Sequence, residues 1–301
     1  MTGVLQATQI AVIGLGAMGY GMALSCLHAG HRTWGFDINP DAMSRFRDDG
    51  GETGEIPPSV DIVMVVVLNA EQTCDVLFGS YGLVSRLKSG AVVIGCATVA
   101  PNFAREMEAR CGEAGVLYLD APISGGAAKA AQGALSIMAA GVPAAFQAAD
   151  PALKACAETV FELGDCAGPG SAMKAVNQLL AGVHIATMAE ALTFGMTQGV
   201  APEQFVEVIS RCAGTSWMLE NRAPHIVDGD YSPKSQINIW PKDLGIVLDI
   251  AKQARFSAPI TAAALQQYMV AVGMGLGPED DAAIAKVYAR NAGLDLPERD
   301  P

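Results

Sequence analysis

Apolar residues in the first half of the chain come in short continuous runs, and segments with helical spacing separate these runs. Runs of this kind, rich in Val and Ile, are typical of parallel strands that are covered on both faces. The five runs cover residues 10–14, 33–36, 61–67, 91–94 and 116–119, and the helical segments lie near 17–29, 40–49, 71–88 and 101–114. Two further runs, 135–140 and 159–163, are expected to add strands at the edge of the same sheet. This alternation predicts an α/β fold with a Rossmann-type doubly wound parallel sheet.

The second half of the chain changes to helical periodicity with few β-branched runs. Its most regular stretch runs from Gly168 to Gly199, where apolar residues recur at steps of three or four. This spacing predicts one long helix with a buried seam. The seam residues are Met173, Val176, Leu180, Val183, Thr187, Ala191 and Phe194. We therefore expect two domains, residues 1–166 with the sheet and residues 167–301 all-α, joined by the long helix.

Composition and charge narrow the classes of protein that this chain can form. The 301 residues are 51% hydrophobic and 17% charged, which is enough apolar material for two folded cores. The net charge of −12 disfavours nucleic acid or an anionic membrane as a partner. The seven cysteines show no CxxC or Cys/His spacing, so neither a metal site nor a disulfide framework is expected.

The cellular location is inferred from the absence of targeting signals in the sequence. The N-terminal stretch MTGVLQATQ has neither a basic region nor an apolar block of signal-peptide length. No run of 18 residues along the chain is apolar without interruption. We therefore expect a soluble, cytoplasmic protein.

A glycine-rich turn joins the first predicted strand to the first predicted helix. It reads Gly14-Leu15-Gly16-Ala17-Met18-Gly19, and Asp37 follows the next strand, 23 residues after Gly14. The full dinucleotide-binding fingerprint consists of a strand, three glycines, a helix, a second strand and an acid, and all of these are present here. The glycines alone would indicate only a tight turn. Gly16 lets the backbone approach a pyrophosphate at the helix N-terminus. Asp37 would accept hydrogen bonds from the adenosine ribose and repel a 2′-phosphate, which favours NAD over NADP.

Ligands of such a sheet bind beyond the carboxyl ends of its strands. Three segments hold that position: Leu68-Asn69 after the third strand, Thr98 after the fourth, and Ser124-Gly125-Gly126 after the fifth. Thr98 either hydrogen-bonds the cofactor or caps the helix that starts near Pro101. Ser124-Gly125-Gly126 offers a hydroxyl and two unobstructed amides that suit a carboxylate, although such a tripeptide also forms ordinary turns.

A lysine near the start of the long predicted helix is a candidate for chemistry. Lys174 falls in the first turn, where a lysine opposes the helix macrodipole. Asn177 and Gln178 follow three and four residues later and share its face, so an ammonium would lie beside two amides. The alternative is a solvated lysine near a helix end.

Two further stretches of the helical half carry polar residues in unusual settings. Trp217 lies among polar residues and either walls a pocket or belongs to the core. Lys242 and Asp243 follow Trp240-Pro241 and begin another helix. A lysine in a first turn again opposes the dipole, and Asp243 partly offsets that cost.

Four motifs occur in the order that characterises one enzyme family. They are GLGAMG at 14–19, DAPISGG at 120–126, GxxxK from Gly170 to Lys174, and KDLG at 242–245. On these motifs the sequence, from Ile10 to about Arg290, resembles the β-hydroxyacid dehydrogenases. This family includes 3-hydroxyisobutyrate dehydrogenase and tartronate semialdehyde reductase and is related to 6-phosphogluconate dehydrogenase. The resemblance implies NAD-dependent oxidation of a small hydroxy acid.

The resemblance also implies roles for residues of the sheet domain and the long helix. Lys174 would be the catalytic residue, and Ser124, Gly125 and Gly126 would hold the substrate carboxylate. Thr98 would contact NAD.

Residues of the helical domain take further implied roles. Lys242 would contact NAD, and Asp243 would lie near the substrate or the nicotinamide. Many family members have asparagine four residues after the lysine, but this chain has Gln178 there and Asn177 just before it. Either amide is a candidate for substrate contact, and Trp217 is another.

The expected chemistry is hydride transfer from a carbinol carbon of the substrate to NAD, with Lys174 handling the hydroxyl proton. A four-carbon polyhydroxy acid such as L-threonate, oxidised at C2, fits the resemblance best. Within the family, 3-hydroxyisobutyrate and tartronate semialdehyde are alternative substrates. A more distant alternative is a non-catalytic NAD-sensing module, which the joint presence of Lys174 and Ser124-Gly125-Gly126 argues against. A homodimer or homotetramer is expected, because an exposed apolar face of a helical domain needs covering.

Overall fold

The computed structural model describes residues 7–80 and 82–299 of the chain. The chain forms two compact units, and the border between them falls between Lys174 and Ala175. This border lies within α7 (Pro169–Thr197), the long helix that the apolar spacing predicts.

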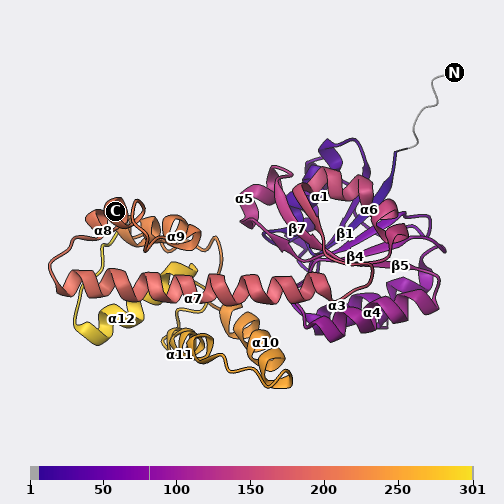
Figure 1. The fold of residues 1–301 in the computed structure, drawn as a ribbon. Helices are drawn as coiled ribbons and strands as arrows, with labels where there is room; N and C mark the ends of the chain where they lie inside the picture. The colour runs from indigo at the N-terminus through magenta and orange to yellow at the C-terminus, as the bar shows by residue number, and fades with distance from the viewer. Residues whose placement is uncertain (1–6, 81, 300–301) are drawn as a thin grey trace. The chain divides into compact units, whose positions relative to one another are not determined.

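The first unit contains a five-stranded parallel sheet, as predicted. Its strands are β1 (Gln9–Ile13), β2 (Arg32–Phe36), β3 (Ile62–Val65), β4 (Val92–Gly95) and β5 (Leu117–Asp120), in the order β2-β1-β3-β4-β5. The strands are buried on both faces because helices cover each side (Figure 1). Helices α1 (Gly19–His28) and α6 (Pro143–Cys156) lie on one face, and α3 (Ala70–Phe78) and α4 (Pro101–Glu113) lie on the other. This unit also contains α2 (Pro40–Asp48) and the 3₁₀ helix η1 (Leu83–Arg86).

Alternation along β1 separates the two cores of this unit. Ile10 and Val12 pack into the cluster that contains Met22 of α1 and Leu153 of α6. The intervening Ala11 and Ile13 belong to a second cluster with side chains of α3 and α4. Successive side chains of a strand point to opposite faces, so an uninterrupted apolar run is what a sheet with two covered faces requires.

The strand register brings the carboxyl ends together at one edge of the sheet. Ile13 lies opposite both Phe36 and Val65, Val65 lies opposite Gly95, and Gly95 lies opposite Asp120. The loops that follow these residues therefore start side by side. The order of the strands reverses between β1 and β3, which is the position where sheets of this type bind ligands.

The prediction that residues 135–140 and 159–163 add strands at the edge of the main sheet is confirmed in part, because both are strands and Ala140 forms an antiparallel bridge to Asp120 of the edge strand β5. They form β7 (Leu135–Ala139) and β8 (Ala157–Glu162), which pair with each other in a separate three-stranded sheet. Its third strand is β6 (Ile123–Ser124), antiparallel to β7. The chain leaves the main sheet at Pro122, a residue that has no N–H with which to continue a ladder. A short helix, α5 (Gly126–Ala131), follows β6.

The second unit is all-helical, as predicted. After α7 come α8 (Pro202–Ile209), α9 (Trp217–Val227), α10 (Ile239–Gln253), α11 (Pro259–Gly273), the 3₁₀ turn η2 (Asp281–Ile284) and α12 (Ala285–Ala292). Its core is built on Trp240 and Tyr268, whose rings stack with centroids 5.6 Å apart. The Tyr268 hydroxyl donates a hydrogen bond to the Gly182 carbonyl of α7 at 2.9 Å. Gly182 lies under Trp240, and a Cβ at this position would come within 2.9 Å of the indole.

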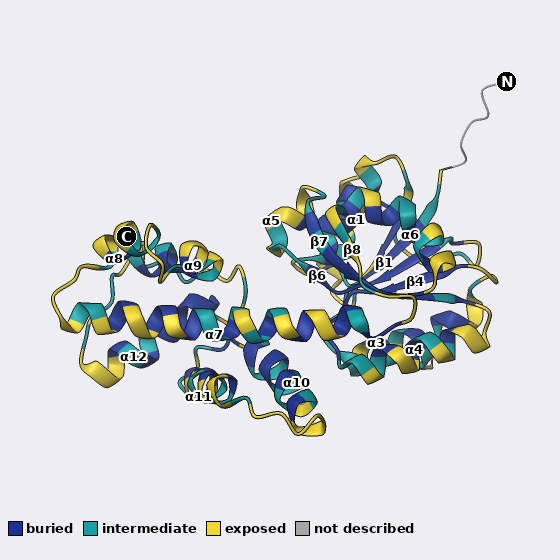
Figure 2. Cartoon of the chain, viewed as in Figure 1, coloured by how far each residue is buried: buried dark blue, intermediate teal, exposed yellow. Residues whose placement is uncertain are grey.

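The seam predicted on α7 is present, but the prediction that it is buried is wrong. Met173, Val176, Leu180 and Phe194 are 45%, 54%, 48% and 65% exposed in the chain. The buried face of the helix lies on the other side and includes Ile185, Met188 and Leu192 (Figure 2). Helical spacing identifies an apolar stripe but does not say what covers it, and α7 carries apolar residues on both faces.

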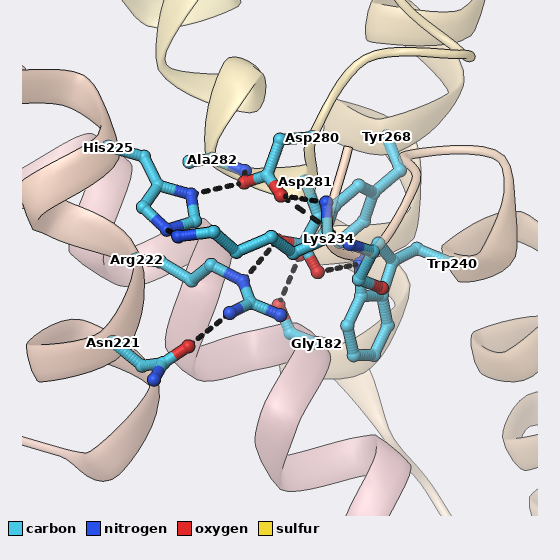
Figure 3. Close-up of polar contacts among 11 residues, drawn as sticks. Gly182, Asn221, Arg222, His225, Lys234, Trp240, Tyr268, Asp280, Asp281 and Ala282 are labelled. Atoms are coloured by element: carbon cyan, nitrogen blue, oxygen red, sulfur yellow. Dashed lines mark hydrogen bonds and ion pairs between the residues drawn. The ribbon is translucent and has the colours of Figure 1, made fainter. Parts of the chain in front are cut away.

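A cluster of buried charges ties α9, α10 and η2 together (Figure 3). Arg222 donates to Asp281 Oδ1 at 2.5 Å, and Trp240 donates its indole N–H to Asp281 Oδ2 at 3.1 Å. Asp280 Oδ1 lies 2.9 Å from His225 Nδ1, and Asp280 also accepts from the backbone N–H of Lys234. Both aspartates are fully buried, so each depends on these partners to offset the loss of hydration. Trp240 precedes Lys242 in α10, so the cluster also fixes the start of that helix.

Among the described residues, α7 is the one helix long and apolar enough to cross a membrane. Ile185, Met188 and Leu192 of this helix pack in the core of the second unit, so we interpret α7 as the core helix of a soluble protein. The expectation that the N-terminus carries no signal peptide concerns a stretch whose residues 1–6 lie outside those described.

Candidate active site

The predicted nucleotide-binding turn adopts a conformation that only glycine allows at two of its positions. Gly14 has φ of +95°, and a Cβ there would lie 2.3 Å from the carbonyl oxygen of Val66, the residue just after β3. A Cβ on Gly19 would lie 1.8 Å from the Gly14 carbonyl oxygen, so α1 starts directly against the turn. Gly16 instead faces open space, which is the geometry expected where a pyrophosphate approaches the backbone.

The residues between these glycines present the backbone to solvent. Leu15 is buried and anchors the turn, whereas Gly16 and Ala17 are exposed and Met18 is half-buried. Among the described residues, the amides of Gly16, Ala17 and Met18 donate to no protein acceptor. Amides at the start of a helix that donate to no protein acceptor can donate hydrogen bonds to phosphate oxygens. The turn therefore fits a dinucleotide.

Asp37 follows β2 and holds the nucleotide turn in place. Its Oδ2 accepts the Leu15 N–H at 2.6 Å, and its Oδ1 accepts the Asn39 N–H at 2.8 Å. Each carboxylate oxygen has a second lone pair, so ribose hydroxyls can still donate to it. Asp37 thus anchors the turn and can still accept hydrogen bonds from the ribose hydroxyls, as the fingerprint predicts.

The other cofactor candidates also lie at the carboxyl edge of the sheet. Leu68 is 53% exposed after β3, and Asn69 caps α3 by accepting the Gln72 N–H. Thr98 follows β4 and does not cap α4, because the N-cap of that helix is Ala100 and has no side-chain hydrogen bond. The capping interpretation of Thr98 is therefore wrong.

Asp120, the last residue of β5, anchors the start of α7. Its Oδ2 accepts the backbone N–H groups of Gly168 and Ser171, both at 2.9 Å, and its Oδ1 accepts the Ser171 hydroxyl at 2.6 Å. Burial raises the pKa of Asp120, and the hydrogen bonds from Ser171 and Gly168 offset part of that rise. The helix starts at Pro169, so Gly170 and Ser171 lie in its first turn. A buried carboxylate at a helix N-terminus also complements the macrodipole.

Lys174 lies one turn beyond Ser171 and is buried, with 8% of its surface exposed. Its ammonium donates to the Ile123 carbonyl oxygen at 2.8 Å. Ile123 directly precedes Ser124, so the ammonium is held next to the predicted carboxylate cradle. The interpretation of Lys174 as a solvated lysine is therefore wrong.

The cradle itself depends on two glycines with positive φ. Gly125 has φ of +138° and Gly126 has φ of +80°, conformations that residues with a Cβ rarely adopt. Gly126 faces open space, and Ser124 ends the short strand β6 with a half-buried side chain. The tripeptide therefore offers a hydroxyl and accessible backbone within the same unit as Lys174.

The second unit holds a chain of polar contacts between α7 and α10. Asn177 donates to Gln178 Oε1 at 2.9 Å, and Gln178 donates to Asp243 Oδ2 at 2.5 Å. The Lys242 ammonium lies 2.6 Å from Asp243 Oδ1. That oxygen has no partner with hydrogen-bond geometry among the described residues, so the lysine contact is a charge contact and not a directed bond.

Trp217 lies at the start of α9 and is 60% exposed, after the N-cap Ser216. It does not belong to the core of its unit. An exposed indole suits contact with a ligand or a partner, which keeps the prediction of a substrate contact open.

Sequence reasoning missed two residues that build the site. Asp120 and Ile123 belong to the recognised motif DAPISGG but were not assigned a role. Gly170 is required because a Cβ there would lie 2.5 Å from the Met138 carbonyl oxygen and 2.6 Å from that of Asp120. An acid at the carboxyl end of a predicted strand was the available signal for Asp120.

Comparison with known proteins agrees with this arrangement. Residues 9–164 match the family model for the NAD binding domain of 6-phosphogluconate dehydrogenase. Residues 168–288 match the model described as NAD-binding of NADP-dependent 3-hydroxyisobutyrate dehydrogenase. The chain belongs to the β-hydroxyacid dehydrogenases, the family of 3-hydroxyisobutyrate dehydrogenase and its relatives.

Individual relatives are similar over nearly the whole chain. An L-threonate dehydrogenase from Cupriavidus necator is 47% identical, covering 96% of this chain and 97% of the relative. One from Escherichia coli K12 is 40% identical, covering 96% of each. A crystal structure named 3-hydroxyisobutyrate dehydrogenase from Salmonella typhimurium is 41% identical with a TM-score of 0.88, covering 93% of this chain and 99% of that one.

Proposed function

We propose that this protein is an NAD-dependent dehydrogenase that oxidises L-threonate at C2 to 2-dehydro-L-erythronate. Relatives named L-threonate dehydrogenase, 40% and 47% identical over almost their full length, support this substrate. The Salmonella structure carries the name 3-hydroxyisobutyrate dehydrogenase, so that acid is the second candidate.

The buried position of Lys174 is the observation that carries the proposal. Lysine side chains are rarely buried, so an ammonium held at 2.8 Å by the Ile123 carbonyl, beside Ser124-Gly125-Gly126, points to a function. As the neutral amine, Lys174 would accept the proton of the C2 hydroxyl during oxidation and so become the ammonium. In the reverse direction it would return that proton to the carbonyl oxygen.

The substrate carboxylate would bind at Ser124, Gly125 and Gly126. The Ser124 hydroxyl and the backbone N–H groups of Gly125 and Gly126, two residues with positive φ, form a concave set of donors that suits an anion. Binding there would hold C2 next to the Lys174 ammonium. The overall charge of −12 repels anions, so this local set of donors has to supply the attraction.

The cofactor would be held by the turn Gly14–Gly19, by Asp37, and by the segments at Leu68-Asn69 and Thr98. Lys242 would also contact it. A nicotinamide dinucleotide accepts the hydride from C2 when bound. Asp37 favours NAD, because a carboxylate already fixed by Leu15 and Asn39 would repel a 2′-phosphate.

A second copy of the chain would cover the exposed seam of α7. Its residues recur at steps of three and four from Met173 to Phe194, the spacing of helices that pack along their length. An isologous dimer with α7 against α7 would bury the same stripe on both copies. We further propose that the protein works in the cytoplasm as this dimer or as a tetramer built from it.

The test is NADH formation with L-threonate, D-threonate, D-erythronate, 3-hydroxyisobutyrate and D-glycerate, run beside Lys174→Ala. Preference for L-threonate that is lost in the variant is the expected result. Preference for 3-hydroxyisobutyrate would contradict the substrate, and activity that survives in Lys174→Ala would contradict the role of the lysine.

A further inference from the structure

Two adjacent amides on α7 are candidates for contact with the substrate, and the structure distinguishes them. Gln178 is buried, with 8% of its surface exposed, and both ends of its amide are engaged. Its nitrogen donates to Asp243 Oδ2 at 2.5 Å, and its oxygen accepts from Asn177 at 2.9 Å. A hydrogen bond to a buried carboxylate is of the strong, charge-assisted kind. A substrate hydroxyl would have to compete with it.

Asn177 is in the opposite situation. It is half-buried, and its nitrogen is occupied by the bond to Gln178. Among the described residues, its Oδ1 accepts no hydrogen bond. Because the nitrogen is tethered, the carbonyl oxygen is held in one orientation and can accept a hydrogen bond without rearrangement. Asn177 follows Lys174 by three residues on the same helix, so the two side chains share a face.

The contacts beyond Gln178 explain why its amide is fixed in this direction. Asp243 accepts only, and Lys242 holds its other oxygen at 2.6 Å. Gln178 must therefore turn its N–H toward Asp243 and its oxygen toward Asn177. Asn177 in turn must donate through its nitrogen and present its oxygen. The order of donors and acceptors thus runs from Asp243 on α10 through Gln178 to Asn177 on α7.

We infer that Asn177 Oδ1 is the acceptor for a non-reacting hydroxyl of the polyhydroxy acid, at C3 or C4, and that Gln178 is a positioning residue that acts through Asp243 and Asn177. This assignment rests on the proposed function. It makes Asn177 the residue that distinguishes a polyhydroxy acid from a hydroxy acid with an aliphatic tail.

The experiment compares L-threonate with 2-hydroxybutyrate of the same C2 configuration, which lacks the hydroxyls at C3 and C4. We would measure kcat and KM for both substrates in the wild type, Asn177→Ala, Asn177→Gln and Gln178→Leu. Asn291→Ala, which removes an exposed amide of α12, is the matched control.

Asn177→Ala is expected to lower kcat/KM for L-threonate by roughly 3- to 10-fold, the effect of one neutral hydrogen bond. The loss should fall on KM, because the hydroxyl does not react. Activity on 2-hydroxybutyrate should fall by less than activity on L-threonate, and the activity that remains also shows that the variant is folded. Asn177→Gln should restore part of the preference, and Gln178→Leu should lower kcat/KM for both substrates.

The outcomes separate this inference from the proposed function. A wild-type enzyme that forms no NADH with L-threonate would overturn both. A wild-type enzyme that prefers L-threonate, with the preference kept in Asn177→Ala and lost in Gln178→Leu, would overturn the inference alone and make Gln178 the substrate contact.

Discussion

Gly170→Ala tests whether the start of α7 positions the reacting lysine. The added Cβ would lie 2.5 Å from the Met138 carbonyl oxygen, 2.6 Å from the Asp120 carbonyl oxygen and 3.0 Å from Asp120 Oδ2. Two of these atoms belong to the backbone of strand residues, so the helix has to move and not the sheet. Overpacking of this kind costs about 1–3 kcal/mol of the free energy of unfolding.

The shift would also reach the active site, because Lys174 lies one turn further along the same helix. A displacement of about 1 Å at a catalytic group can lower the rate about 100-fold. We expect Gly170→Ala to lower kcat with L-threonate by about 10- to 100-fold and to lower the melting temperature. The assays are steady-state NADH formation and thermal unfolding.

Gly195→Ala is the matched control, since it makes the same substitution in the same helix. Its Cβ would lie 3.6 Å from the nearest atom, in Val200, which is an ordinary contact. Alanine in place of glycine in a helix stabilises by about 0.5–1 kcal/mol. If Gly170→Ala kept wild-type kcat and matched Gly195→Ala in stability, the reasoning about the close approach at Asp120 would be refuted.

Three further predictions concern stability and assembly. Arg255 has φ of +54° just after α10, a conformation that strains a residue with a Cβ. Arg255→Gly should therefore raise the free energy of unfolding by about 0.5–1 kcal/mol in chemical denaturation. A variant that is less stable than the wild type would contradict the strain. Burial alone would raise the pKa of Asp280, but hydrogen bonds from His225, Lys234 N–H and Ala282 N–H lower it on balance. A lowered pKa stabilises the fold above the ordinary carboxyl pKa, and this contribution is lost as pH falls through the lowered value. Asp280→Asn should therefore lower the free energy of unfolding by about 1–3 kcal/mol near pH 7 and by progressively less below about pH 4. An equal loss at the two pH values would contradict this linkage. Leu180→Glu places a charge on the exposed seam of α7 and should convert the oligomer to monomer by light scattering, with Glu190→Gln as control; an unchanged mass would contradict the proposed interface.

Local sequence patterns predicted the parts of the fold in which one strand or one helix carries its own signal. The runs of β-branched residues located β1 to β5, because strands buried on both faces have no polar positions. The glycine turn and Asp37 were also predicted from a local pattern, the dinucleotide-binding fingerprint. Helices α5 and α6 were missed because their alanine-rich segments have weak periodicity, and α6 contains Pro151.

Features that depend on distant contacts could not be predicted from spacing. Asp120 and Ser171 are 51 residues apart in sequence. Nothing in the local sequence shows that the Asp120 carboxylate anchors α7, the helix that contains Ser171. The choice of buried face on α7 failed for a related reason. Both stripes of that helix are apolar, and the covered one is set by partners such as Trp240 and Leu244.

The most direct measurement of the central claim is the fate of the hydrogen at C2 of L-threonate. The enzyme would be supplied with NAD and L-threonate deuterated at C2, and the reduced cofactor would be analysed by mass spectrometry. The account predicts that each NADH formed carries one deuterium. Unlabelled NADH formed at a normal rate would contradict oxidation at C2 and, with it, the placement of that carbon beside Lys174.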